Sequence, residues 1–133
     1  MEYGKIMSIV QPSELPIPNM LRDFMQSEQH CHDGIGHVDS FRAFDQLLSD
    51  QRVDFIDFVR VPHGSSIGRH RHGNNTEWYV IMSGSGSMWF NQQEVTVGPW
   101  DVLINQPYHE HGLVNESGQD IVIVVFQLGE PDA

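Results

Sequence analysis

The sequence contains little that would bind polyanions or cross a membrane. Only 7 Lys and Arg residues stand against 18 Asp and Glu residues, and the formal net charge is −11. Such a chain repels phosphate backbones and anionic lipid, which argues against non-specific binding to nucleic acid or to a membrane surface. The longest apolar run, Ile121 to Phe126, is far too short to span a bilayer, and the N-terminus lacks the basic flank and apolar segment of a signal peptide.

Cysteine is almost absent. The single Cys31 cannot form an internal disulfide, so nothing in the sequence requires an oxidising compartment. We therefore expect a soluble, cytoplasmic protein without nucleic-acid or membrane partners.

The 133 residues suit one globular domain preceded by an arm. Residues 11–20 carry three prolines, which favour an extended segment, and residues 26–39 are polar with no periodic apolar face. Phe41, Phe44, Leu47 and Leu48 would suit a short amphipathic helix that begins after Asp39 or Ser40. We expect residues 1–50 to pack as an arm on the barrel or on a dimer partner, and residues 51–133 to form the barrel domain.

After residue 50 the chain becomes a series of short apolar stretches separated by turns rich in Gly, Asn, Ser and Pro. Short strands at this spacing predict an all-β antiparallel sandwich or barrel. The candidate strands are Val53 to Val61, a short piece running into His70 and His72, Glu77 to Met82, Ser87 to Phe90, Glu94 to Val97, Val102 to Asn105, His109 to Val114 and Ile121 to Leu128.

Histidine is abundant, with eight residues, and three metal-ligating side chains lie close together in the barrel domain. His70 and His72 are two residues apart, so on a strand both side chains project from one face, about 7 Å apart along the chain. Glu77 opens the next candidate strand after a short turn. If the two strands pair, its carboxylate can return to the same place.

This segment resembles the first motif of the cupin superfamily, G-x5-H-x-H-x3,4-E-x6-G, and more specifically that of small single-domain cupins. The residues that make the match are Gly64, His70, His72, Glu77 and Gly84. Five residues of three types at fixed offsets are a specific signal.

The second cupin motif, G-x5-P-x-G-x2-H-x3-N, is only partly kept. Its final pair matches His111 and Asn115. An alternative alignment that starts from Gly98 selects His109 instead, but it places Leu113 where the pattern has Asn. The departures from the pattern are Trp100, Gln106 and Tyr108, which stand where the family has Gly, Pro and Gly.

The resemblance implies a double-stranded β-helix, the jelly-roll barrel, that binds one divalent metal through His70, His72, Glu77 and His111. Three imidazoles and a carboxylate suit Fe(II), Mn(II), Ni(II), Cu(II) or Zn(II), and an octahedral shell would leave two positions for water or substrate. Because each histidine must be neutral to bind metal, affinity should fall below about pH 6.

Other residues are candidates for roles around this site. Tyr79 is two residues from Glu77, so on a strand both side chains project from the same face, and Tyr79 should line the cavity, where it could move protons. His109 shares parity with His111, so on a regular strand both point inward, and it could be a general base, a partner of a ligand, or an ordinary histidine at the mouth of the barrel. Arg60 is a candidate to pair with an anionic substrate, whereas Arg69 and Arg71 alternate with the ligands and should point outward. The remaining cluster, His30, Cys31, His32 and His37, matches no zinc-site spacing and is interpreted as a polar arm.

The resulting prediction is a metal-dependent enzyme that acts on a small polar molecule, as an oxygenase, isomerase or epimerase, decarboxylase or lyase. A non-catalytic module that binds a sugar or another small molecule, and a metal-stabilised structural protein, remain alternatives. Because open sheet edges invite pairing, we also expect a homodimer.

Overall fold

The computed structural model describes residues 25–45 and 52–129 of the chain. In this part of the chain, regular structure is almost entirely β, and no helix has the length and apolar character needed for a membrane crossing. The elements are β1 (Gln26–Gln29), the 3-10 turn η2 (Cys31–Asp33), β2 (His37–Asp45), β3 (Val53–Val61), β4 (Ser66–Arg71), β5 (Asn75–Ser83), β6 (Gly86–Phe90), β7 (Gln93–Val97), β8 (Val102–Asn105), β9 (Glu110–Val114) and β10 (Ile121–Gly129).

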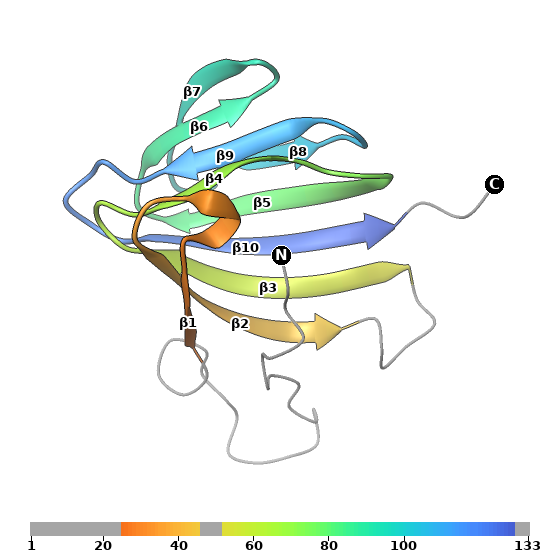
Figure 1. Cartoon of the computed structure of the whole chain (residues 1–133), viewed down its shortest axis with the longest axis horizontal. Helices are drawn as coiled ribbons and strands as arrows, with labels where there is room; N and C mark the ends of the chain where they lie inside the picture. Colours follow the sequence, from red (N-terminus) through yellow and green to blue (C-terminus); the bar gives the residue numbers. More distant parts are fainter. Residues whose placement is uncertain (1–24, 46–51, 130–133) are drawn as a thin grey trace, which may run out of the picture.

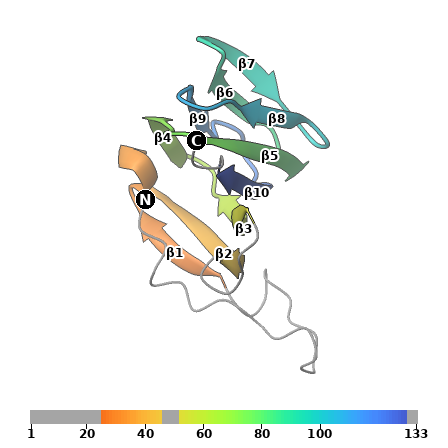
Figure 2. The same cartoon turned by 90° about the vertical axis from the view of Figure 1, so that its right-hand side faces the viewer.

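The strands form two antiparallel sheets, as the all-β prediction required. One sheet has the order β1-β2-β3-β10-β5-β8 and the other β4-β9-β6-β7. Figures 1 and 2 show the β6–β7 hairpin at one end of the molecule and the β1–β2 pair at the other. The chain passes repeatedly between the sheets, which is the jelly-roll, or double-stranded β-helix, arrangement.

Alternation along the strands builds the core between the two sheets. On β3 every second residue from Phe55 to Val61 is buried, and on β10 the same holds for Ile121, Ile123 and Val125. Met88 and Leu113 from the smaller sheet are fully buried as well. Each apolar side chain among them contributes about 1.5 to 3 kcal/mol when it leaves water.

The predicted short helix after Ser40 is wrong, because residues 37–45 form strand β2, paired with β3. Its inward positions are Val38, Ser40 and Arg42, all buried. Two of these three are polar, so the sequence does not show the alternation of apolar and polar residues that indicates a half-buried strand. Arg42 lies inside because its guanidinium donates two hydrogen bonds, of 2.9 and 3.2 Å, to the Asp57 carboxylate.

The described part of the predicted arm belongs to the larger sheet. Strand β1 pairs with β2, and β2 pairs with β3. The proline-rich residues 11–20, and Leu47 and Leu48 of the predicted helix, lie outside the described residues. The boundary at residue 50 stays a prediction.

Two glycines of the first motif have backbone conformations that other residues rarely adopt. Gly64 and Gly84 both have φ +79°, in the left-handed region. At Gly84 a Cβ atom would also lie 2.2 Å from the carbonyl oxygen of Asp120. Any side chain at Gly84 would therefore displace the start of β10.

Candidate metal centre

The four predicted metal ligands come together inside the barrel. His70 lies on β4, His72 just after it, Glu77 on β5 and His111 on β9. His70 and His111 are direct cross-strand partners, so their side chains leave the smaller sheet on the same inner face. We call these four residues, His70, His72, Glu77 and His111, the ligand group; one ligand atom from each lies within 4.8 Å of the others.

The distances in the ligand group match the edges of a metal coordination shell. His111 Nε2 lies 3.0 Å from His72 Nε2 and 3.1 Å from His70 Nε2. Glu77 Oε1 lies 3.0 Å from His111 Nε2 and 3.3 Å from His72 Nε2. Metal–nitrogen bonds of about 2.1 Å at right angles place adjacent ligand atoms about 3.0 Å apart.

Hydrogen bonds at the far side of two imidazoles orient their lone pairs. His70 Nδ1 lies 2.7 Å from the carbonyl oxygen of Gly68, which can only accept, so Nδ1 donates and Nε2 carries a lone pair. His72 Nδ1 likewise lies 2.9 Å from Asn75 Oδ1. Imidazoles that ligate a metal are held in this way by a partner at the other nitrogen.

The charge states of Glu77 and His70 also suit a cation. Burial alone would raise the pKa of Glu77, but hydrogen bonds from His111 and His72 lower it to about 2, so the carboxylate is ionised. Burial lowers the pKa of His70 to about 3 and keeps this imidazole neutral. Burial acts in the same direction on His72, but the hydrogen bond with Glu77 and its charge, together with hydrogen bonds to Asn75 and Gln127, raise that pKa above its ordinary value. A buried carboxylate surrounded by imidazole nitrogens fits a divalent transition metal, and these residues could hold one.

A residue that the sequence analysis assigned to the polar arm lies against this site. The His32 ring stacks on the His70 ring, with centroids 3.6 Å apart and planes 9° from parallel. The contact depends on Gly68, where a Cβ atom would lie 2.0 Å from the carbonyl oxygen of His32. Burial lowers the pKa of His32 to about 4, so it is neutral beside His70. The turn η2 therefore lies against β4 next to the ligand group, and Figure 1 shows the short orange coil of η2 beside β4.

A small cavity adjoins the ligand group on the side of η2. Its volume is about 20 Å³, which is room for roughly one water molecule. Cys31, His32, Glu77 and Tyr79 are among its lining residues. Burial raises the pKa of the Cys31 thiol, so this sulfur is protonated.

Tyr79 lies where its strand parity predicted. Its side chain is buried, and its ring centroid lies 4.7 Å from that of His111. Burial, followed by the charge of Glu77, raises the pKa of Tyr79 well above 10. The phenol is therefore neutral and can donate a proton in a hydrogen bond, but it is a poor base.

Two other predicted site residues lie away from the ligand group. His109 is exposed and precedes β9, because Tyr108 has a left-handed φ of 64° and the strand begins only at Glu110. Arg60 alternates with buried residues of β3 and pairs with Asp39 on β2 at 2.8 Å. Neither residue belongs to the ligand group, so their roles stay predictions.

Comparison with known proteins agrees with the geometry. The family model described as cupin domain matches residues 57–126. A curated relative, the oxalate-binding protein of Thermotoga maritima, is 25% identical over 88 residues, which cover 66% of this chain and 73% of the relative.

Solved structures show the same fold at low sequence identity. A Thermotoga maritima protein described as a predicted oxalate decarboxylase has a TM-score of 0.80 at 19% identity and covers 86% of this chain and 100% of its own. The plu4264 protein of Photorhabdus luminescens has a TM-score of 0.68 at 17% identity, with coverage of 86% and 88%. The cupin domain of Schizosaccharomyces pombe Cnp3 has a TM-score of 0.68 at 12% identity, with coverage of 84% and 72%.

Proposed function

The chain belongs to the cupin domain family, and from this premise we propose that it binds one divalent transition metal through the ligand group and acts as a metal-dependent enzyme on a small polar molecule. The observation that carries the proposal is the convergence of three Nε2 atoms and one carboxylate oxygen within 4.8 Å. Fe, Mn, Ni, Cu and Zn all suit this donor set. A bound metal would supply Lewis acidity or a site for redox chemistry.

The residues around the ligand group limit what the substrate can be. The adjoining cavity of about 20 Å³ admits one water-sized group unless η2 moves away from β4. The substrate would therefore be small and would bind with one polar group directed at the ligand group. Tyr79, neutral and buried beside His111, is the hydrogen-bond donor to a bound substrate that the geometry favours. His109 faces solvent and is the weaker candidate.

The relative named oxalate-binding protein suggests a small dicarboxylate as the first ligand to test. Its name equally supports the second candidate function, a cupin that holds a small acid without converting it. The two differ in one measurement, because an enzyme consumes oxalate and releases CO₂, whereas a binding protein gains thermal stability and leaves oxalate unchanged.

For an enzyme we expect oxalate consumption by protein loaded in turn with Fe, Mn, Ni, Cu and Zn. Tyr79→Phe should lower the rate at least about 10-fold without changing metal content, because it removes only the hydroxyl. Thr96→Ala, on the exposed side of β7, is the matched control and should react like wild type. A raised melting temperature without consumption would establish the binding function. If oxalate is not consumed and does not raise the melting temperature, oxalate is excluded as the ligand for both candidate functions.

We also propose that the protein is a homodimer, formed through the outer face of the larger sheet. On that face Trp78 stacks on Phe126, with ring centroids 5.1 Å apart. Val102 and Ile104 on β8, the edge strand of this sheet, are 56% and 38% exposed. A contiguous apolar face of this kind is unusual for a monomer.

Light scattering should give twice the 15.2 kDa monomer mass for the wild type and the monomer mass for Ile104→Glu. Thr96→Glu, on the other sheet, should stay dimeric. A wild-type protein that is monomeric at micromolar concentration would refute the dimer. The cytoplasmic location stays a prediction of the sequence.

A further inference from the structure

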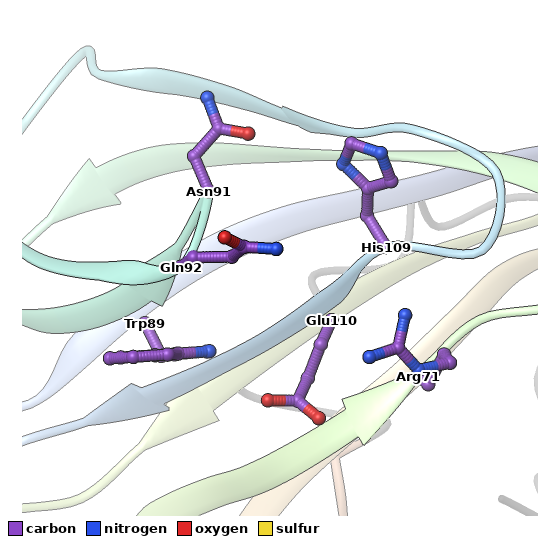
Figure 3. A pocket seen from close by; sticks show the side chains of 6 residues that line it. All are labelled: Arg71, Trp89, Asn91, Gln92, His109 and Glu110. Carbon is purple, nitrogen blue, oxygen red and sulfur yellow. The ribbon is translucent and has the colours of Figure 1, made fainter.

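A second hollow lies on the outside of the smaller sheet, away from the ligand group. It has a volume of about 350 Å³, within the range of small-molecule sites. Its lining residues are Arg71, Trp89, Asn91, Gln92, His109 and Glu110, and we call it the outer hollow (Figure 3). Arg71 alternates with His70 and His72 along the chain, so the outer hollow and the ligand group lie on opposite faces of β4.

We propose that the outer hollow is a binding site for a neutral saccharide. Its lining combines an indole held in place, a Glu110 carboxylate without a partner among the described residues, an Arg71 guanidinium that bonds only one backbone carbonyl, and two amides, with no excess of either charge.

The indole of Trp89 is held at the floor of the outer hollow. The Arg69 guanidinium lies over the Trp89 ring, 3.7 Å from the ring centroid. The two side chains meet across Gly112, the cross-strand partner of Trp89. A Cβ atom at Gly112 would lie 3.0 Å from the backbone nitrogen of Arg69, so glycine keeps this space free. In Figure 3 the indole nitrogen points toward Glu110, and no described residue accepts a hydrogen bond from it.

Two opposite charges in the outer hollow do not neutralise each other. Arg71 and Glu110 are direct cross-strand partners on β4 and β9, the arrangement in which an ion pair is expected. The Arg71 guanidinium instead donates to the backbone carbonyl of Tyr108. Among the described residues the Glu110 carboxylate has no hydrogen-bond or ion-pair partner, and Figure 3 shows both side chains bordering the same space. One strong acceptor and one strong donor are thus available to a ligand.

The turn between β6 and β7 adds two amides. Asn91 and Gln92 have φ of 54° and 65°, so both are left-handed, as in a two-residue type I′ turn. Asn is favoured in such turns, but Gln at the second position costs free energy that Gly would not. In Figure 3 the Gln92 amide lies beside the indole. Each amide offers both donors and an acceptor.

This combination favours a sugar over other small ligands. Vicinal hydroxyls both donate and accept, and therefore match a carboxylate, a guanidinium and two amides together, while the C–H face of a sugar ring packs on an indole. A phosphate or nucleotide would meet the unpaired Glu110 carboxylate and a chain of net charge −11. A purely apolar ligand would leave the charged and amide groups of the hollow unpaired.

The test is a titration of the metal-loaded full chain with sugars. Binding is monitored through the chemical shift of the Trp89 indole N–H in NMR spectra. The resonance is assigned by its loss in Trp89→Phe. The probes are glucose, galactose, mannose, N-acetylglucosamine, maltose and cellobiose, with inorganic phosphate as a separate arm. We expect at least one sugar to shift the Trp89 resonance with a dissociation constant of about 1 mM or lower.

Glu110→Gln keeps the size of the side chain and should weaken that binding about 10-fold or more, because a hydrogen bond to a charged group is lost. Thr96→Ala, outside the hollow on β7, should bind like wild type. Metal content should be equal in all variants, which separates this site from the ligand group. Shifts with phosphate alone, no shift with any sugar, or equal affinity in Glu110→Gln would each overturn the proposal.

Discussion

His72→Ala is expected to abolish metal binding at concentrations that saturate the wild type. The variant removes one of the three imidazole nitrogens that, with the Glu77 carboxylate, form the ligand group. Loss of a residue that merely orients a ligand typically costs 10- to 100-fold in affinity, so loss of the ligand itself should cost more than about 100-fold. The measurement is metal analysis of protein dialysed against buffered metal, with one ion per chain expected for the wild type.

His109→Ala is the matched control, because His109 is two residues from His111 in the sequence and faces solvent. It should retain wild-type metal content. Circular dichroism of the His72→Ala variant should remain that of a β protein, because the His72 side chain lies beside the core and is not part of it. Equal metal in wild type and His72→Ala would refute the ligand group, and loss of metal in His109→Ala would move the fourth ligand there.

Only the pair His70 and His72 was predictable from local geometry, whereas His111, on β9, was predicted through the resemblance to the second cupin motif. Side chains at His70 and His72 share a face of any strand. The pairing of their strand with the strand of Glu77 does not form, because β4 and β5 belong to different sheets, and Glu77 reaches the ligand group from the opposite sheet. The strands after residue 50 were also predictable from local patterns, since their apolar stretches end in turn residues. β3 and β8 run over the predicted residues Val53–Val61 and Val102–Asn105.

The contact of His32 with His70 could not be predicted, because it depends on two backbones that are distant in sequence. Gly34 and Gly68 let η2 approach β4 so closely that a Cβ atom at Gly34 would lie 2.2 Å from the Ser66 carbonyl oxygen. Arg60 shows the same limitation. Its partner Asp39 lies on a strand that the sequence pattern did not reveal.

The degraded second motif shows how a fold tolerates the loss of its glycines. Trp100 and Tyr108 stand where the cupin pattern has Gly, and both keep a glycine-like backbone, with φ of 73° and 64°. The Tyr108 amide donates to the Gly73 carbonyl, which holds the loop, and His111 still reaches the ligand group. Both aromatic side chains point into solvent, 73% and 58% exposed. The substitution therefore costs backbone strain and leaves the site geometry intact.

The second large effect is expected from acid on the metal-free protein. The pKa of His70 is lowered to about 3 and that of His32 to about 4, both below the 6.5 of an unfolded chain. Below pH 6.5 these two histidines therefore bind protons in the unfolded state but not in the native state, and the free energy of unfolding falls as the pH falls. His72 acts in the opposite direction because its pKa is raised, so its contribution to stability is present below pH 6.5 and is lost as the pH rises through its folded pKa. Glu77, lowered to about 2, contributes above pH 4.5 and loses that contribution only between 4.5 and 2.

Two lowered histidines outweigh one raised histidine between pH 7 and 5, so the melting temperature of chelated protein should fall by more than about 5 °C over this range. Differential scanning fluorimetry with and without metal measures it. Metal-loaded protein should start higher and fall more steeply, because protons compete with the ion for the imidazoles. His32→Ala should flatten the fall in the chelated protein, whereas His63→Ala, on an exposed turn, should not. A melting temperature independent of pH in the chelated wild type would mean that these imidazoles are not buried in their neutral form.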